Sequence, residues 1–474
     1  MSARDSQWRH RPEELAAFLP EGFSVGAATA AFQIEGAVRE GGRGASVWDE
    51  FTAQPGRILD GSDASVATDH YHRYREDVRL LRELGVDTYR FSISWPRVQP
   101  GGRGGTNREG VAFYDRLLDE LLAAGIRPMA TLYHWDTPAE LTGGWLNRDT
   151  AYRFAEYVYL CAEAFGDRID SWVTINEPAT VTLNGYALGV HAPGATLLFD
   201  ALPSAHHQLL GHGLAVQALR DVGVAGRIGI TNVHSPVEPA SDNEQDAAFA
   251  ALFDTVHNRI FADPVLLGHY PEPPEPFVDL FAALAEIEPD DLRTISAPLD
   301  FYGLNYYFPS RVAAGSGGVN SPDGESAAMS ALPFHLVGWP EFATTGFGWP
   351  VAPDYLGVAL RELGERYGDA LPPVIITEGG ASYPDAAAAD GSITDRARIE
   401  YLGDHLVAAL EATAPGGVAS GVDLRGYTVW SLLDNFEWAA GYSQRFGLVH
   451  LDLRTQTRTP KMSYRWLQSV LSAR

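Results

Sequence analysis

Residues 171–178 read Ser171-Trp172-Val173-Thr174-Ile175-Asn176-Glu177-Pro178, an apolar run that ends on a polar pair. The pattern predicts a short strand that stops at Asn176 and Glu177, because the proline behind them cannot continue the hydrogen-bond ladder of a sheet. Residues 373–380 have the same pattern, since four apolar or β-branched residues lead directly to Glu378. We therefore expect both glutamates at the ends of buried strands, held at the rim of a sheet.

The same alternation of strand and helix patterns continues along the chain. Strands and helices in alternation favour a parallel sheet of βαβ units, and eight such strands close into a TIM barrel. We predict an α/β protein with a (β/α)8 TIM barrel and extended loops at its C-terminal face; an open, doubly wound sheet is the alternative. The predicted helices are residues 70–84, 109–124, 149–165, 203–222, 353–367 and 463–471. The predicted strands are residues 23–30, 88–94, 127–133, 171–177, 227–233, 300–307, 374–377 and 426–432.

We expect a single domain over residues 1–474, because α/β barrels of this length commonly form one domain. Residues 1–20 are interpreted as an N-terminal extension. Residues 308–352 are interpreted as a long loop region between the sixth and seventh strands. Within it, residues 313–330 are rich in Gly, Ser and Ala and would overhang the C-terminal rim. Both a mobile lid and a plain surface loop fit this composition.

Composition and charge exclude several classes of protein. A formal net charge of −26 argues against binding to nucleic acid, which requires a basic face. No run approaches the roughly 18 apolar residues of a membrane span, so no membrane association is predicted. No metal-ligand spacing, phosphate-binding loop or dinucleotide fingerprint stands out, so we predict neither a metal nor another cofactor.

Two residue types that occur only once also carry information. Cys161 is the single cysteine and excludes an intramolecular disulfide. Residues 1–20 lack the apolar core of a signal peptide, and a cytoplasmic location is therefore expected. Lysine occurs once, at Lys461, which we interpret as codon bias and not as chemistry.

Polar side chains gather at the predicted strand ends, and in a barrel these ends converge on one pocket. Several have a structural alternative: His134 as a satisfied core histidine, Arg90 as a structural ion pair, Gln33 as a loop cap and Tyr307 as core packing. A glutamate at a strand end could likewise form a salt bridge across the barrel. Together they favour a functional site, because independent structural needs would not place them all on one rim. Two carboxylates on such a rim are the minimum equipment for cleaving a glycosidic bond. The polar residues at the predicted strand ends are Gln33, Arg90, His134, Asn176, Glu177, Asn305, Tyr307, Glu378 and Glu437.

Two of these stretches resemble the motifs of glycoside hydrolase family 1. Residues 174–178, Thr-Ile-Asn-Glu-Pro, are similar to the family's T-x-N-E-P motif, and residues 376–380, Ile-Thr-Glu-Gly-Gly, resemble its I/V-T-E-N-G motif. The resemblance covers essentially the whole chain. Gly379 stands where the family usually has Asn, and Ile175 stands where Phe is common, but neither departure alters a carboxylate. Further similar stretches are residues 23–36, 133–138, 430–442 and 445–452.

The resemblance implies a retaining β-glycosidase that acts by double displacement, with its carboxyl groups about 5–5.5 Å apart. Glu378 is the expected nucleophile, and Glu177 is the expected general acid and base. Arg90 and Tyr307 match the positions that hold the nucleophile charged and oriented. The nucleophile must be ionised and the acid protonated, so the environments of the two carboxyl groups must differ.

The resemblance also implies a set of sugar-binding residues. Asn176 would face the 2-hydroxyl, Trp430 would supply a stacking floor, and Trp438 would offer its indole N–H to a hydroxyl. Trp349 resembles a residue of the aglycone site, with core packing as a rival interpretation. The expected substrate-binding residues are Gln33, His134, Trp135, Asn176, Asn305, Trp349, Trp430, Glu437, Trp438 and Phe446.

The leading hypothesis is a β-glucosidase that acts on small β-glucosides or cello-oligosaccharides, with β-galactosides and β-fucosides as further substrates. The closest rival is a 6-phospho-β-glycosidase. Relatives with that activity carry Ser and Lys after the eighth strand, whereas residues 437–442 contain no lysine and keep Glu437, whose charge would repel phosphate. A non-catalytic sugar-binding member would typically lack one catalytic carboxylate, and a transglycosylase would differ only in what intercepts the ester. The sequence predicts no particular oligomeric state.

Overall fold

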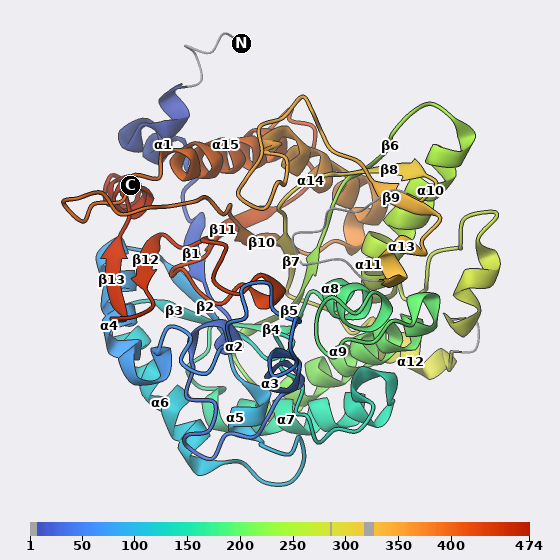
Figure 1. Cartoon of the computed structure of the whole chain (residues 1–474), viewed down its shortest axis with the longest axis horizontal. Helices are drawn as coiled ribbons and strands as arrows, with labels where there is room; N and C mark the ends of the chain where they lie inside the picture. Colours follow the sequence, from blue (N-terminus) through green and yellow to red (C-terminus); the bar gives the residue numbers. More distant parts are fainter. Residues whose placement is uncertain (1–6, 285–286, 317–326) are drawn as a thin grey trace.

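The computed structural model describes residues 7–284, 287–316 and 327–474, and its centre is a closed barrel of parallel strands (Figure 1). Neighbouring strands follow the order β1-β11-β10-β7-β5-β4-β3-β2, and β1 pairs with β2 to close the ring. The predicted TIM barrel is confirmed, and each predicted strand overlaps an observed one. The barrel strands are β1 (Ser24–Ala28), β2 (Thr88–Ser92), β3 (Arg127–Thr131), β4 (Ser171–Asn176), β5 (Arg227–Val233), β7 (Phe301–Asn305), β10 (Val374–Gly379) and β11 (Leu424–Trp430).

Helices surround the barrel and cover its outer face (Figure 1). The six predicted helices are observed within one residue of their predicted ends. Gly85 ends the first of them at φ +83°, the left-handed conformation in which glycine carries no steric penalty. These helices are α4 (His70–Leu84), α6 (Arg108–Ala123), α7 (Asp149–Phe165), α9 (Leu202–Val222), α14 (Pro353–Tyr367) and α16 (Met462–Ser472).

Other helices were not predicted from the sequence. The longest, α15 (Arg396–Thr413), is buried over most of its circumference and therefore lacks the single apolar stripe by which an amphipathic helix is recognised. Three more, between β5 and β7, are α10 (Glu244–Asp254), α11 (Ile260–Leu267) and α12 (Pro289–Ile295). Shorter helical turns are α1 (Pro12–Phe18), α2 (Ala31–Ile34), α3 (Val47–Thr52), α5 (Trp95–Val98), α8 (Pro178–Thr180) and α13 (Ala327–Ser330).

Two small sheets lie outside the barrel. One combines β6 (Val237–Pro239), β8 (Ser310–Ala314) and β9 (Phe334–Leu336). The region predicted as a long loop, 308–352, therefore contains β8, β9 and α13, while its residues 317–326 lie outside the described residues. The other sheet is an antiparallel hairpin of β12 (Val449–Asp452) and β13 (Thr457–Pro460), which lies beside α4 (Figure 1).

The predicted N-terminal extension is packed against the barrel's helices where it is described. Its helix α1 contacts α16, and the Trp466 indole N–H donates to the His10 carbonyl at 2.8 Å. Residues 1–6 lie outside the described part of the chain. Within that part, no helix is long and apolar enough to cross a membrane.

The barrel interior is tightly filled, which gives a direct test of the packing. A Cβ added to Gly229 in β5 would lie 2.6 Å from the Phe301 carbonyl oxygen and 2.7 Å from its ring. Overpacking of this kind typically costs about 1–3 kcal/mol. We expect Gly229→Ala to lower the free energy of unfolding by that amount, as measured by urea denaturation.

The matched control is Gly105→Ala, because no atom lies within 4 Å of a Cβ built at this exposed glycine. Its effect should stay within about 0.5 kcal/mol of wild type. Equal stability of the two variants would contradict the described packing between β5 and β7.

Candidate active site

The two glutamates lie at the carboxyl ends of barrel strands, where the sequence predicted them. Glu378 is within β10, and Glu177 follows β4 directly. Glu177 has a left-handed backbone (φ +48°), uncommon for a residue with a side chain, and Pro178 then begins α8. Both side chains are buried, with 6% of Glu177 and 3% of Glu378 exposed.

Glu378 is held by two charge-stabilising donors. The Arg90 Nη1 group donates to its Oε1, and the Tyr307 hydroxyl donates to its Oε2 at 2.7 Å. Burial, and then the charge of Glu378, raises the pKa of Tyr307 well above 10, so this hydroxyl keeps its proton for donation. Both carboxylate oxygens of Glu378 therefore accept a hydrogen bond, one from a guanidinium and one from a hydroxyl.

Glu177 has a different environment. Its Oε1 accepts from Asn305 Nδ2 at 2.6 Å, and its Oε2 accepts from the Thr180 hydroxyl at 2.7 Å. Burial and then the charge of Glu378 raise the pKa of Glu177 to about 7, although the two hydrogen bonds act in the opposite direction. Near neutral pH, therefore, Glu177 can both hold and release a proton.

A network centred on Arg90 joins the two carboxyl groups to their neighbours. Arg90 Nη2 donates to Asn176 Oδ1 at 2.6 Å, and Asn305 Nδ2 lies 3.2 Å from the same oxygen. The Asn176 amide nitrogen lies 3.1 Å from His134 Nε2. Burial and then the charge of Arg90 lower the pKa of His134 well below 6.5, so its imidazole is neutral. The network thus spans β2, β4 and β7.

On another side of the barrel mouth, Gln33 contacts the segment that follows β11. Its Nε2 donates to the Phe436 carbonyl at 2.9 Å and to Asn435 Oδ1 at 3.1 Å, and it lies 3.4 Å from Glu437 Oε2. Gln33 is fully buried, yet its Oε1 has no hydrogen-bond partner among the described residues. The same holds for His134 Nδ1. Each is a buried polar atom that can form a hydrogen bond with a further polar group.

Aromatic rings adjoin these polar groups. Trp438 packs against Trp135 at a centroid distance of 4.4 Å and stacks on Phe32 at 6.0 Å. The Trp135 indole N–H donates to the Asn176 carbonyl at 2.9 Å, so this ring supports the polar network. Trp430 stacks against the His134 ring at 5.9 Å.

Trp349 and Phe446 form a separate aromatic group beside Tyr307, the hydroxyl donor to Glu378. Trp349 stacks on Phe347 at 4.5 Å, and the Phe446 ring lies 6.0 Å from Trp349 and 6.3 Å from Tyr307. Trp349 remains half-buried, whereas 2% of Phe446 is exposed. Both the aglycone interpretation and the packing interpretation of Trp349 therefore have a structural basis.

Several supporting residues were missed at the sequence level. Thr180 lies three residues after Glu177, a spacing at which a threonine hydroxyl can reach back at a helix start, and this signal was available. Thr377 donates to Asn305 Oδ1 at 2.8 Å, and Asn435 accepts from Gln33. These two contacts join residues far apart in the chain, so no local pattern reveals them.

Glu177→Gln tests the raised pKa of this carboxyl without any substrate. Because its pKa is about 7 in the folded protein against an ordinary 4.5, the folded state keeps a proton that the unfolded chain loses in this range. Wild-type stability should therefore fall by up to about 3 kcal/mol between roughly pH 5 and pH 8 on account of this group. The amide variant lacks this loss, so its stability relative to wild type should increase with pH in urea unfolding.

Glu163→Gln, at an exposed glutamate of α7, is the control and should show a pH-independent difference from wild type. If the stability gain of Glu177→Gln did not grow with pH, the carboxyl of Glu177 would not have the raised pKa described above.

Comparisons with known proteins identify the family of the chain. The sequence profile of glycosyl hydrolase family 1 matches residues 15–474. β-Glucosidase A of Acetivibrio thermocellus is 42% identical over 455 residues, 96% of this chain and 98% of the relative. A bifunctional β-D-glucosidase/β-D-fucosidase of Bifidobacterium breve is 40% identical, over 97% and 99% of the two chains. The crystal structure of a psychrophilic β-glucosidase of Micrococcus antarcticus has a TM-score of 0.89 at 44% identity, with 99% of each chain covered. The chain thus belongs to glycosyl hydrolase family 1.

Proposed function

We propose that this protein is a retaining β-glucosidase that releases terminal β-D-glucosyl residues from small glycosides. The observation that carries the proposal is the contrast between two buried carboxyl groups. Glu378 accepts from Arg90 and Tyr307, whereas Glu177 faces neutral donors and has its pKa raised to about 7 by burial and by Glu378. One ionised and one protonated carboxyl group at the same barrel mouth are what a double displacement requires.

In the first step, the Glu378 carboxylate attacks the anomeric carbon while Glu177 protonates the departing oxygen. A glycosyl ester forms on Glu378, and the aglycone leaves as an alcohol. Forming the ester removes the negative charge that helps to raise the pKa of Glu177. Glu177 then becomes a better match for its second role, in which it takes a proton from the water that hydrolyses the ester. Arg90 and Tyr307 would orient Glu378 throughout.

The sugar would be held by groups that pair with its hydroxyls. Gln33 Oε1 and His134 Nδ1 support this assignment, because both are buried without a partner among the described residues. Asn176 would face the 2-hydroxyl, where contacts strengthen in the transition state. The further assignments are Glu437 and Trp438 to hydroxyls, Trp430 to the face of the sugar ring, Trp349 and Phe446 to the aglycone side, and Trp135 and Asn305 to the support of Asn176 and Glu177.

Cello-oligosaccharides are included among the substrates because they end in the same β-glucosyl residue, which would give the protein a part in cellulose degradation. β-Fucosides and β-galactosides are included as well, and the activity named for the Bifidobacterium breve relative supports the former. A cytoplasmic location completes the proposal, in keeping with a single, buried cysteine.

The substrate class is tested by kcat/KM on p-nitrophenyl β-D-glucoside, β-D-galactoside, β-D-fucoside and β-D-glucoside 6-phosphate. We expect glucoside or fucoside to be preferred and the phosphate to be inert, because Glu437 would repel it. Preferred turnover of the phosphate would favour the 6-phospho-β-glycosidase. Lack of activity on all four would favour a sugar-binding protein.

The roles of the two carboxyl groups are separated by exchanging each for alanine in the presence of azide. Removal of a nucleophile typically costs about 10⁴-fold or more in kcat. In Glu378→Ala, azide should occupy the vacated space and yield the α-glycosyl azide. In Glu177→Ala, the ester still forms on Glu378 from an activated substrate, and azide should yield the β-glycosyl azide. Product stereochemistry by NMR is the measurement, and the reverse pattern would exchange the two roles.

A further inference from the structure

The β12–β13 hairpin is joined through its backbone to the segment that follows β11. Leu448 N donates to the Ser431 carbonyl and Val449 N to the Leu432 carbonyl, each at 2.9 Å. Asp434 N donates back to the Val449 carbonyl at 2.9 Å. The hairpin is therefore hydrogen-bonded to residues 431–434, which begin the segment that leads to Glu437 and Trp438.

Immediately after the hairpin, the only lysine of the sequence is fully buried between two carboxylates. Lys461 Nζ lies 2.7 Å from Asp434 Oδ1 and 2.5 Å from Asp385 Oδ2. Asp385 also pairs with Arg398 of α15 at 2.8 Å, and His450 Nδ1 lies 3.2 Å from Asp434 Oδ2. Lys461 thus connects the loop after β10 with the loop after β11.

Asp434 links Lys461 to residues near Phe446 and Glu437, which are proposed to contact the substrate. Its Oδ1 accepts the Gly447 N–H at 2.9 Å, next to Phe446, and it lies three residues before Glu437. Burial alone would raise the pKa of Asp434, but Lys461, His450 and Arg398 together lower it. The carboxylate is therefore ionised and depends on its cations.

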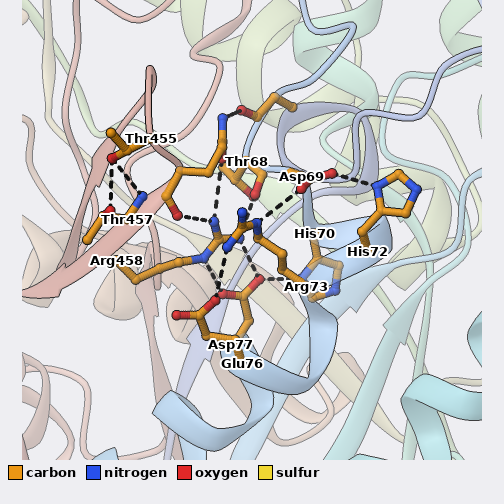
Figure 2. Close-up of polar contacts among 12 residues, drawn as sticks. Thr68, Asp69, His70, His72, Arg73, Glu76, Asp77, Thr455, Thr457 and Arg458 are labelled. Atoms are coloured by element: carbon orange, nitrogen blue, oxygen red, sulfur yellow. Dashed lines mark hydrogen bonds and ion pairs between the residues drawn. The ribbon is translucent and has the colours of Figure 1, made fainter.

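At the other end of β13, Arg458 joins the hairpin to Thr68 and to Asp77 of α4, as Figure 2 shows. Its Nε donates to Asp77 Oδ1 at 2.9 Å, and its Nη2 donates to the Thr68 carbonyl at 2.5 Å. His70 Nδ1 lies 2.8 Å from the second Asp77 oxygen. The Thr68 hydroxyl in turn donates to the Ile34 carbonyl at 2.9 Å, directly after Gln33.

We infer that the β12–β13 hairpin, through Arg458 and Lys461, is the positioning element that holds Gln33 and Glu437 in register for the sugar. The two residues come from opposite ends of the chain, and the side-chain amide of Gln33 contacts Asn435, Phe436 and Glu437. Lys461 touches no substrate and is a positioning residue that acts through Asp434. The inference rests on the proposed function, because it takes Gln33 and Glu437 as sugar-binding groups.

The test uses Lys461→Met in the full chain, which keeps a long side chain but removes the lysine cation from buried Asp434, while Asp385 keeps its pair with Arg398. Substrates are p-nitrophenyl β-D-glucoside and its 6-deoxy analogue, which lacks the hydroxyl that carries the phosphate in the 6-phosphate expected to be repelled by Glu437. Displacement of Glu437 should lower kcat/KM for the glucoside about tenfold or more, mainly through KM, and that for the analogue by less than about threefold. The ratio of kcat/KM for the glucoside to kcat/KM for the 6-deoxy analogue, here called the discrimination ratio, should therefore decrease.

Arg148→Met is the matched control, because it removes a cation from Asp291, a carboxylate of α12 that belongs to neither loop. It should leave the discrimination ratio at the wild-type value. If Lys461→Met does not fold, Asp434→Asn replaces it. This isosteric change removes the ion pair between Asp434 and Lys461, while Lys461 keeps its ion pair with Asp385. Restored discrimination in Lys461→Arg would be a further expected result.

Wild-type and variant activities distinguish failure of the proposed function from failure of this inference. Wild-type activity on the glucoside reports the proposed function, and its absence would overturn that function and this inference together. With wild type active, a folded variant whose discrimination ratio is unchanged would overturn the inference alone, even if its melting temperature fell, because the hairpin would then serve stability only.

Discussion

The ion pair between Arg90 and Glu378 is the interaction on which the rest of the site depends. Both partners are almost entirely removed from water, with side-chain exposures of 1% and 4%. The desolvation of such a pair is repaid only when the remaining donors find acceptors. Arg90 meets this condition by donating to Thr131 Oγ1, to the Thr377 carbonyl and to Asn176 Oδ1 as well. One guanidinium therefore ties together the mouth ends of β2, β3, β4 and β10, and it fixes both the proposed nucleophile, Glu378, and the Asn176 amide proposed to bind the sugar.

This arrangement gives the two carboxyl groups at one rim different environments. The cation lies directly on Glu378, whereas Glu177 is buried beside the negative charge of Glu378 and faces neutral groups, Asn305 and Thr180. Geometry contributes too, because the left-handed backbone of Glu177 directs its side chain at a strand end where a regular strand would continue. Backbone strain of this kind persists only where the surroundings hold it in place.

The sequence was sufficient for the barrel and for the strand-end positions of Glu177 and Glu378, because strand patterns and the polar residues that end them are local signals. It was insufficient for α15, whose all-round burial hides its periodicity, and for the pairing of donors with acceptors across the barrel. Lys461 is the clearest case. Its rarity suggested codon bias, yet folding brings it against Asp434 and Asp385, which lie 27 and 76 positions away in the chain. Only the tertiary structure brings such a triad together.

The burial of the only lysine also sets how the chain meets reagents and proteases. Amine-directed cross-linkers and labels find no exposed side-chain amine in this sequence, because Lys461 is inaccessible in the folded state. The same residue is the single target of a lysine-specific protease, which can cut only after the C-terminal helix and hairpin have separated. Cleavage of the bond after Lys461 would therefore follow unfolding of this region, so the amount of cleaved chain would measure unfolding.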